Sequence, residues 1–169
     1  MKFDNFAMFS RIFVVGPQRS GTRIAAKMIA HDTGHEFIDE RDFEIDSLTR
    51  LYELLMRKQE KIVVQAPGIT RWIQDIVTED DLAVFCNRSL QEIFASQKRV
   101  NWHYDWVESI KYGQPANSAA IKKRWWPERQ APMIPHRIEV RYPQDLLDHP
   151  LWVDPEARKS WTAIQTEKR

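Results

Sequence analysis

The chain has 169 residues, of which 43% are hydrophobic and 29% charged, and its formal net charge at pH 7 is +1. This length suits a single domain with one core, and the composition excludes a disordered or collagen-like chain. No stretch approaches the roughly eighteen apolar residues of a membrane span, and the first residues lack the apolar core of a secretory signal. The sequence therefore predicts a cytoplasmic protein with no membrane partner, and its single cysteine, Cys86, excludes an internal disulfide.

The charges are unevenly distributed along the chain. Residues 88–142 hold ten lysines and arginines against five acidic residues, whereas the remainder is acidic. A local excess of this size predicts an anionic small ligand and no nucleic acid, because a nucleic-acid backbone usually requires a strongly basic domain. An ordinary solvated basic face is the alternative.

Short apolar runs alternate with segments of helical periodicity. In chain order, the sequence predicts a strand at 11–16, a helix at 22–31, a short strand or an extended connection at 36–39, a helix at 47–58, strands at 61–66 and 82–86, a helix at 89–99, a strand at 138–142 and a helix at 155–166. Near-continuous apolar strands favour a parallel sheet that is covered on both faces. The predicted fold is a three-layer α/β sandwich with its ligand site at the carboxyl ends of the strands.

The segment at about 112–137 combines several prolines, few aliphatic residues and the run KKRWWPER. This composition predicts a loop-rich basic excursion over the surface of a single domain that spans residues 1–169. Long loops of this kind often bind ligands.

The best strand is followed by the loop Gly16–Arg23, of sequence GPQRSGTR. Two glycines five positions apart and a following hydroxyl residue have the spacing of a phosphate-binding loop, in which backbone N–H groups at a helix N-terminus face an anion. An NTPase has lysine directly after the second glycine, and here that residue is Thr22, which argues against ordinary NTP hydrolysis. A tight turn with a solvated Arg19 is the alternative.

Gln18–Thr22 (QRSGT) resembles the 5′-phosphosulfate loop of the sulfotransferases, which is usually Pro-(Lys/Arg)-Ser-Gly-Thr. Arg88, after the strand LAVFCN, and Ser96, eight residues later, resemble the arginine and serine with which that family binds the 3′-phosphate of its donor. An arginine at a strand end and a hydroxyl two turns into the next helix can converge on one phosphate.

Two weaker similarities follow in the same order. Residues 64–67 (VQAP) and the segment 140–150 (VRYPQDLLDHP) extend the resemblance from about residue 12 to residue 150. The chain departs from the family pattern at Arg23 and Ile24, which replace the usual Thr-Trp, and it lacks a glycine-rich adenine loop near the C-terminus. It is similar to a small, atypical member of the P-loop type.

The resemblance implies an enzyme that moves a sulfuryl group from 3′-phosphoadenosine 5′-phosphosulfate (PAPS) to an acceptor hydroxyl or amine by in-line displacement, with no metal. Arg19 would stabilise the leaving phosphate, and Arg88 with Ser96 would hold the 3′-phosphate. The implied donor-binding residues are Gln18, Arg19, Ser20, Gly21, Thr22, Arg23, Arg88 and Ser96.

A general base should deprotonate the acceptor, and related enzymes use a histidine or a glutamate. The acidic stretch after the first helix makes Glu40 the first candidate and Glu36 the second, with His103 as a further choice; a solvated acidic loop is the alternative. The five histidines lack a metal-ligand spacing, so no metal site is predicted.

Several aromatic and basic side chains of the basic segment could bind the acceptor. Indole rings can hold a sugar ring, so a small-molecule or carbohydrate acceptor is predicted; core packing, or a surface between copies in a homo-oligomer, explains the tryptophans equally well. The residues are Trp102, Trp106, Trp125 and Trp126, with Lys122, Lys123 and Arg124.

Two other classes of function remain open. One is a P-loop nucleotide or nucleoside kinase with an atypical loop, and the other is a non-catalytic nucleotide-binding module.

Overall fold

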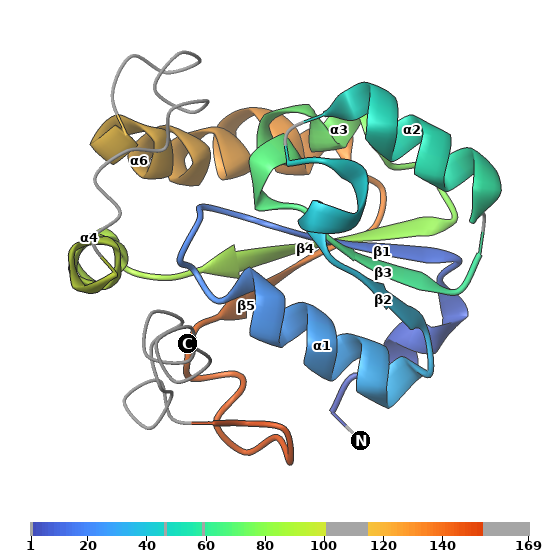
Figure 1. The fold of residues 1–169 in the computed structure, drawn as a ribbon, viewed down its shortest axis with the longest axis horizontal. Coiled ribbons are helices and arrows are strands. Elements are labelled where there is room, and N and C mark those ends of the chain that lie inside the picture. Colours follow the sequence, from blue (N-terminus) through green and yellow to red (C-terminus); the bar gives the residue numbers. More distant parts are fainter. Residues whose placement is uncertain (1, 46, 59, 101–114, 154–169) are drawn as a thin grey trace, which may run out of the picture.

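The computed structural model describes residues 2–45, 47–58, 60–100 and 115–153. Its centre is a sheet of five strands in the order β2-β3-β1-β4-β5 (Figure 1). Every neighbouring pair in this sheet is parallel. The strands are β1 (Arg11–Val15), β2 (Glu36–Ile38), β3 (Ile62–Gln65), β4 (Asp81–Asn87) and β5 (Arg137–Arg141). The predicted α/β sandwich and all five of its predicted strands are confirmed.

Helices connect the strands. The α-helices are α1 (Thr22–Thr33), α2 (Leu48–Arg57), α3 (Ile73–Ile76), α4 (Leu90–Arg99) and α6 (Pro115–Trp125). Short helical turns are η1 (Asp4–Met8), η2 (Glu40–Phe43), η3 (Pro67–Trp72), η4 (Trp126–Gln130) and η5 (Ala131–Met133). The helix predicted at 155–166 lies outside the described residues. None of the helices in the described ranges is long and apolar enough to cross a membrane.

The core has two halves, one on each face of the sheet. Side chains alternate along a strand, so in β1 Ile12 and Val14 join one apolar cluster while Phe13 and Val15 join the other. Helix α1 covers the first face, and α2, α3 and α6 cover the second (Figure 1). Both faces of β1 are therefore buried, which explains its continuous apolar run.

Local signals set the starts of two helices. The Ser47 hydroxyl accepts a hydrogen bond from the Arg50 N–H at 3.3 Å, and the Ser89 hydroxyl accepts one from the Glu92 N–H at 3.2 Å. The sequence offers Asp46 or Ser47 as the N-cap of α2 and has a capping-box spacing from Ser89 to Glu92 at α4; in the structure Ser47 and Ser89 are the N-caps.

The prediction of a loop-rich excursion at 112–137 is wrong for most of that segment. Residues 115–125 form α6, and η4 and η5 follow it. The prolines misled the prediction, because Pro127 and Pro132 stand within the first two positions of η4 and η5, where a missing N–H costs little. Ala119, Lys122 and Trp126 are each at most 3% exposed and recur at helical spacing, so this segment packs against the sheet.

Candidate functional site

The loop between β1 and α1 is held in an irregular conformation from both ends. Its backbone φ is +136° at Gly16, +69° at Arg19 and +92° at Gly21. The hydroxyl of Thr70, a fully buried residue of η3, accepts a hydrogen bond from the Gly16 N–H at 3.0 Å and lies 2.7 Å from the Pro67 carbonyl oxygen. The first residue of the loop is thus anchored to the segment that follows β3.

Both glycines are required by close contacts. A Cβ on Gly16 would lie 2.8 Å from the backbone oxygen of Cys86, and a Cβ on Gly21 would lie 2.1 Å from the ring of Tyr142. Carbon atoms in contact are normally about 3.5–4.0 Å apart. The loop therefore lies flat against β4 at one end and against the residue after β5 at the other.

The three polar residues that the sequence singles out on the β4 side come together. The Arg88 guanidinium donates from Nη1 to the Arg19 carbonyl oxygen at 3.0 Å. The Arg19 side chain donates from Nε to the Ser96 hydroxyl at 3.1 Å. Two arginines and one serine, from the loop, the end of β4 and α4, thus form one cluster at the carboxyl edge of the sheet.

Tyr142 connects this cluster to the loop. Its ring is 5% exposed and packs against Gly21, and the Arg88 guanidinium lies over it at 4.6 Å from the ring centroid. A cation over an aromatic face is stabilised electrostatically, so the Tyr142 ring helps to hold the Arg88 guanidinium in place.

Two buried polar atoms, one in the loop and one in the cluster, have no hydrogen bond among the described residues. Ser20 Oγ and Arg88 Nε have no hydrogen-bond partner in the part of the chain that the structure describes. An unsatisfied buried polar atom costs about 1–3 kcal/mol, more when charged, so each of these two atoms is available to a water or a ligand. A serine donor and a guanidinium beside a helix N-terminus suit a phosphate.

On the β3 side of the loop, a neutral side chain contacts the start of α1. Gln65, the last residue of β3, donates from its side-chain amide to the Thr22 hydroxyl at 3.1 Å. The Glu40 N–H donates to the amide oxygen of Gln65 at 3.5 Å. The structure thus brings Glu40, the first candidate for a base, to the same edge of the sheet as the loop.

Two of the predicted site residues that the structure describes, Arg23 and Glu36, are not brought into the cluster. The Arg23 guanidinium forms an ion pair with Asp39, with Nε 2.6 Å from Oδ2, so its side chain is engaged away from Ser20. Glu36 stands at the first position of β2, at the amino edge of the sheet, where it pairs with Lys58. Glu36 is therefore wrong as a candidate base, and His103 lies outside the described residues.

The basic and aromatic residues of α6 and η4 have separate roles. Trp126 is 2% exposed, stacks on Phe85 with ring centroids 4.6 Å apart and donates from Nε1 to Glu139, so it belongs to the core and not to an acceptor site. Lys123 donates to the Asn87 side chain and the Arg88 carbonyl oxygen, and burial lowers the pKa of its amine. Arg124 is exposed, and Trp102 and Trp106 lie outside the described residues.

Lys122 lies beside the loop, at a position that the sequence did not indicate. Its side chain is 1% exposed, and Nζ donates to Gln18 Oε1 at 2.8 Å and to the Pro67 carbonyl oxygen at 2.9 Å. Within a run of three basic residues it has the pattern of a solvated face. Only its helical spacing from the buried Ala119 and Trp126 distinguishes it.

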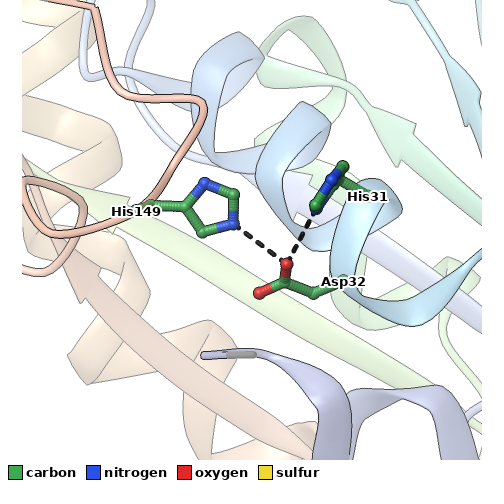
Figure 2. A group of neighbouring side chains, drawn as sticks. All are labelled: His31, Asp32 and His149. Carbon is green, nitrogen blue, oxygen red and sulfur yellow. Dashed lines mark hydrogen bonds and ion pairs between the residues drawn. The ribbon is translucent and has the colours of Figure 1, made fainter.

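A second polar cluster lies at the far end of α1. Asp32 Oδ1 is 3.0 Å from both His31 Nδ1 and His149 Nε2 (Figure 2). These three side chains have the ligand types of a metal site, and their ligand atoms lie within 4.8 Å of one another. Sequence spacing missed the group because His149 is 117 positions away from Asp32.

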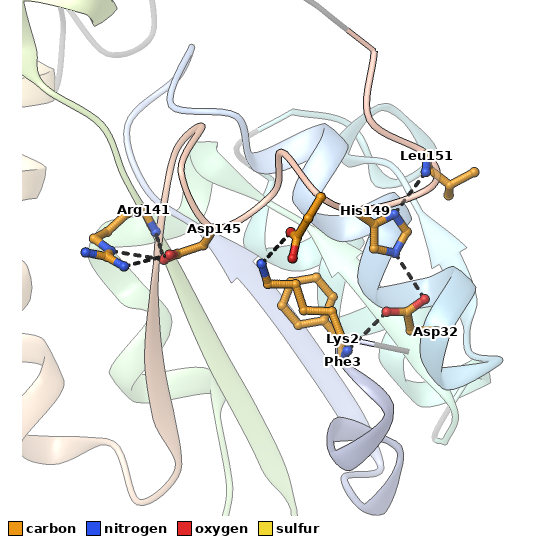
Figure 3. Close-up of polar contacts among 8 residues, drawn as sticks. Lys2, Phe3, Asp32, Arg141, Asp145, His149 and Leu151 are labelled. Atoms are coloured by element: carbon orange, nitrogen blue, oxygen red, sulfur yellow. Dashed lines mark hydrogen bonds and ion pairs between the residues drawn. The ribbon is translucent and has the colours of Figure 1, made fainter.

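Its hydrogen bonds fit a structural tie better than a metal site. The Leu151 N–H donates to His149 Nδ1 at 3.0 Å, so the lone pair is on Nδ1 and a neutral ring carries its hydrogen on Nε2 (Figure 3). A metal at Nε2 would need the opposite tautomer. Asp32 also accepts from the Phe3 N–H at 3.0 Å, so one carboxylate holds the N-terminal segment, α1 and the segment after β5 together.

A cavity of about 390 Å³ lies along α2, away from the loop. Its charged lining is largely paired, since Arg50 contacts both Glu44 and Glu53. No residue of the loop lines this cavity, and it does not enter the site.

The parallel order β2-β3-β1-β4-β5, with the glycine loop between β1 and α1, defines an α/β protein with a P-loop NTPase-like fold. Among solved structures, the chain is similar to the shikimate kinase from Acinetobacter baumannii in complex with shikimate, with a TM-score of 0.54 and 18% identity over 81% of this chain and 87% of that one. No family model and no curated protein matches the chain. The comparisons support the P-loop part of the sulfotransferase resemblance, and the neighbour is a kinase.

Proposed function

We propose that the protein is a P-loop transferase that binds a doubly phosphorylated adenosine and moves a sulfuryl group from PAPS to an acceptor hydroxyl or amine. The observation that carries this proposal is the convergence of Arg88, Arg19 and Ser96 beside the glycine loop. A loop for one phosphate and a second cationic pocket at the end of β4 suit a ligand with two separate phosphate groups.

The residues on the β4 side would hold the donor. The backbone N–H groups at the start of α1 and the Ser20 hydroxyl face the 5′-phosphosulfate, and Arg88 with Ser96 binds the 3′-phosphate. The Arg88 Nε, which is buried without a hydrogen-bond partner among the described residues, supplies a charge-assisted donor for this purpose. Arg19 lies between the two groups and would stabilise negative charge on the bridging oxygen as the S–O bond breaks.

On the β3 side, Glu40 would accept the proton of the acceptor. Its backbone is connected through Gln65 to Thr22, so it stands on the opposite side of the loop from Arg88. An attacking oxygen and a leaving phosphate on opposite sides of the transferred group is the arrangement that in-line displacement requires. The acceptor proton passes to the carboxylate while the new S–O bond forms.

A kinase is the second candidate, and the fold likeness to shikimate kinase favours it. The side chains of Thr22 and Gln65 argue against a kinase. Thr22 stands where an NTPase has the lysine that reaches the β- and γ-phosphates, and it is bonded to the neutral amide of Gln65, with no carboxylate in that contact to help hold Mg²⁺. A phosphate cradle of this kind is better suited to transfer without a metal.

Ligand-dependent stability separates the candidates. Adenosine 3′,5′-bisphosphate, the desulfated donor, should raise Tm without Mg²⁺, because a ligand that binds only the folded state stabilises it. A response to ATP with Mg²⁺, and none to the bisphosphate, would replace the sulfotransferase by the kinase. If the protein binds the bisphosphate but transfers no sulfuryl group to any phenol, alcohol, amine or sugar, it would be a non-catalytic nucleotide-binding module.

Arg88→Met tests the assignment of the second phosphate. Loss of a charge-assisted hydrogen bond costs about 1.5–3 kcal/mol, so the dissociation constant of the bisphosphate should rise roughly tenfold to a hundredfold. Arg124→Met is the matched control, since that side chain is 63% exposed. Equal affinities of the two variants would remove Arg88 from the site.

A further inference from the structure

We infer that the edge strand β5 pairs with the same strand of a second copy of this chain, in an antiparallel arrangement that continues the sheet from one copy into the other. β5 is the last strand in the order β2-β3-β1-β4-β5, so β4 occupies only one of its two sides. Its first three residues, Arg137, Ile138 and Glu139, are exposed. The inference concerns a surface between two chains and does not depend on the proposed transfer reaction.

The backbone of β5 has unused hydrogen-bonding groups on the side away from β4. The Tyr142 N–H, directly after β5, donates to the Asn87 carbonyl oxygen of β4 at 2.8 Å. In a parallel strand both backbone groups of one residue point to the same side, and those of the next residue point to the other. The N–H and C=O groups of Arg137 and Glu139 therefore point away from β4, and they have no hydrogen-bond partner among the described residues. Unpaired groups of this kind are a template for another strand.

The edge that is open to pairing is short. Arg141 also points away from β4, but its N–H donates to Asp145 Oδ2 at 2.7 Å and its carbonyl oxygen accepts from the Asp145 N–H at 2.9 Å. Before β5, Pro135 has no N–H to offer a neighbouring strand. Pairing with a second copy is therefore confined to residues 137–139.

The charges of this edge select one register. When Arg137 lies opposite Glu139 of the second copy, the reverse pair forms as well, and both pairs exchange their outward backbone hydrogen bonds. The two copies of Ile138, a residue that is 39% exposed, then meet at the close position between these pairs. Centring the contact on residue 137 or 139 would place two arginines or two glutamates opposite each other, which destabilises strand pairing. The register centred on Ile138 is thus the self-complementary one.

The charges of Arg137 and Glu139 are also uncompensated within the described part of the chain. Arg137 donates from Nη1 to the Ile134 carbonyl oxygen at 2.7 Å. The Glu139 carboxylate accepts from Trp126 Nε1 at 3.0 Å and from Asn87 Nδ2 at 3.1 Å. All three of these contacts are with uncharged groups. Because residues two positions apart lie on the same face of a strand, Arg137 and Glu139 can meet their opposite charges on the second copy together.

The test is the oligomeric state of the intact chain, measured by sedimentation equilibrium over a series of concentrations. Arg137→Glu and Glu139→Lys each place like charges opposite each other, so each should raise the dissociation constant of the dimer roughly tenfold. An equimolar mixture of these two variants should dimerise again, because every opposing pair then joins opposite charges. Arg124→Glu makes the same change in net charge at a side chain that is 63% exposed on α6, and it should dimerise like the wild type.

The Tm of each variant is compared with that of the wild type first, because Glu139→Lys removes the acceptor of Trp126. Ile138→Asp serves if that variant fails to fold, since it places two carboxylates at the close position on an exposed face. It should likewise raise the dissociation constant roughly tenfold.

Three results would overturn the inference. One is a wild type that stays monomeric at the highest concentration at which it is soluble, since the charges of β5 would then keep copies apart. Another is a dimer that Arg137→Glu and Ile138→Asp both leave as stable as in the wild type, because such a dimer uses another surface. The third is a mixture of folded Arg137→Glu and Glu139→Lys proteins that stays monomeric. Nucleotide binding is measured separately, so none of these results decides the proposed function.

Discussion

Replacing Gly21 by alanine tests whether the contact between the loop and Tyr142 is as tight as the structure has it. The new Cβ would lie 2.1, 2.7 and 2.8 Å from three carbons of the Tyr142 ring. The Tyr142 ring is 5% exposed and the Arg88 guanidinium lies over it, so the ring has little room to move. The backbone φ of +92° adds strain for any residue with a Cβ.

Two contributions set the size of the effect. Overpacking in a filled interior costs about 1–3 kcal/mol. The left-handed backbone costs an L-residue roughly 1–2 kcal/mol. Together they predict a loss of about 3 kcal/mol, which for a chain of this size lowers Tm by roughly 6–12 °C.

Gly34→Ala is the matched control. Its φ is +71° and no atom lies within 4 Å of the position of its Cβ, so it carries the backbone strain without the clash. Thermal unfolding followed by circular dichroism should show a fall in Tm of roughly 2–8 °C for this variant. A Gly21→Ala protein that is no less stable than Gly34→Ala would refute the packing of Tyr142 on the loop. In the double variant with Tyr142→Ala, the clash should disappear and the two effects should not add.

Three further outcomes are expected. Burial raises the pKa of Cys86, so its thiol should react with an aromatic disulfide reagent at pH 8 only as fast as the protein unfolds; immediate reaction would contradict its burial. Asp81→Asn should cost about 3 kcal/mol in urea unfolding, because it leaves Arg11 without the buried carboxylate that it contacts at 2.6 and 2.7 Å. Burial raises the pKa of Asp32, but hydrogen bonds from both histidines and the Phe3 N–H outweigh it and leave the pKa below its ordinary value. The stabilisation by Asp32 is therefore present above the usual aspartate pKa and is lost as the pH falls through the lowered value. In Asp32→Asn, the free energy of unfolding should consequently depend less on pH in the acid range. The same acid dependence in the variant and the wild type would contradict the role of Asp32.

Features with a local cause were predictable from the sequence. The five strands follow from short apolar runs, and the N-caps of α2 and α4 follow from Ser47 and Ser89. The loop between Gly16 and Gly21 follows from its spacing and its place after the first strand. Arg88 and Ser96 were identified through a resemblance, and the structure places them with Arg19.

Features that depend on contacts between distant segments were not predictable. Lys122 lies 104 positions from Gln18, and the tie between Asp32 and His149 spans 117 positions. No periodicity within a window of the sequence encodes such pairs. The helical segment from α6 to η5 was missed for a different reason: proline was taken as a breaker, although it is tolerated at the first positions of a helical turn, as in η4 and η5. Glu36 was misplaced because 36–39 was left open as a strand or an extended connection; as the first residue of a strand, Glu36 stands at the amino edge of the sheet, away from the site.

Tyr142 follows β5, the last strand of the sheet in the chain, and its ring packs against Gly21 of the glycine loop, which ends 121 residues earlier. During synthesis the first strand and helix emerge long before Tyr142 does. A nascent chain that ends before residue 142 contains all of the glycine loop but lacks the surface against which Gly21 and Arg88 rest. The proposed anion site should therefore be completed late, when the edge strand docks, and not when the glycine loop itself has been made.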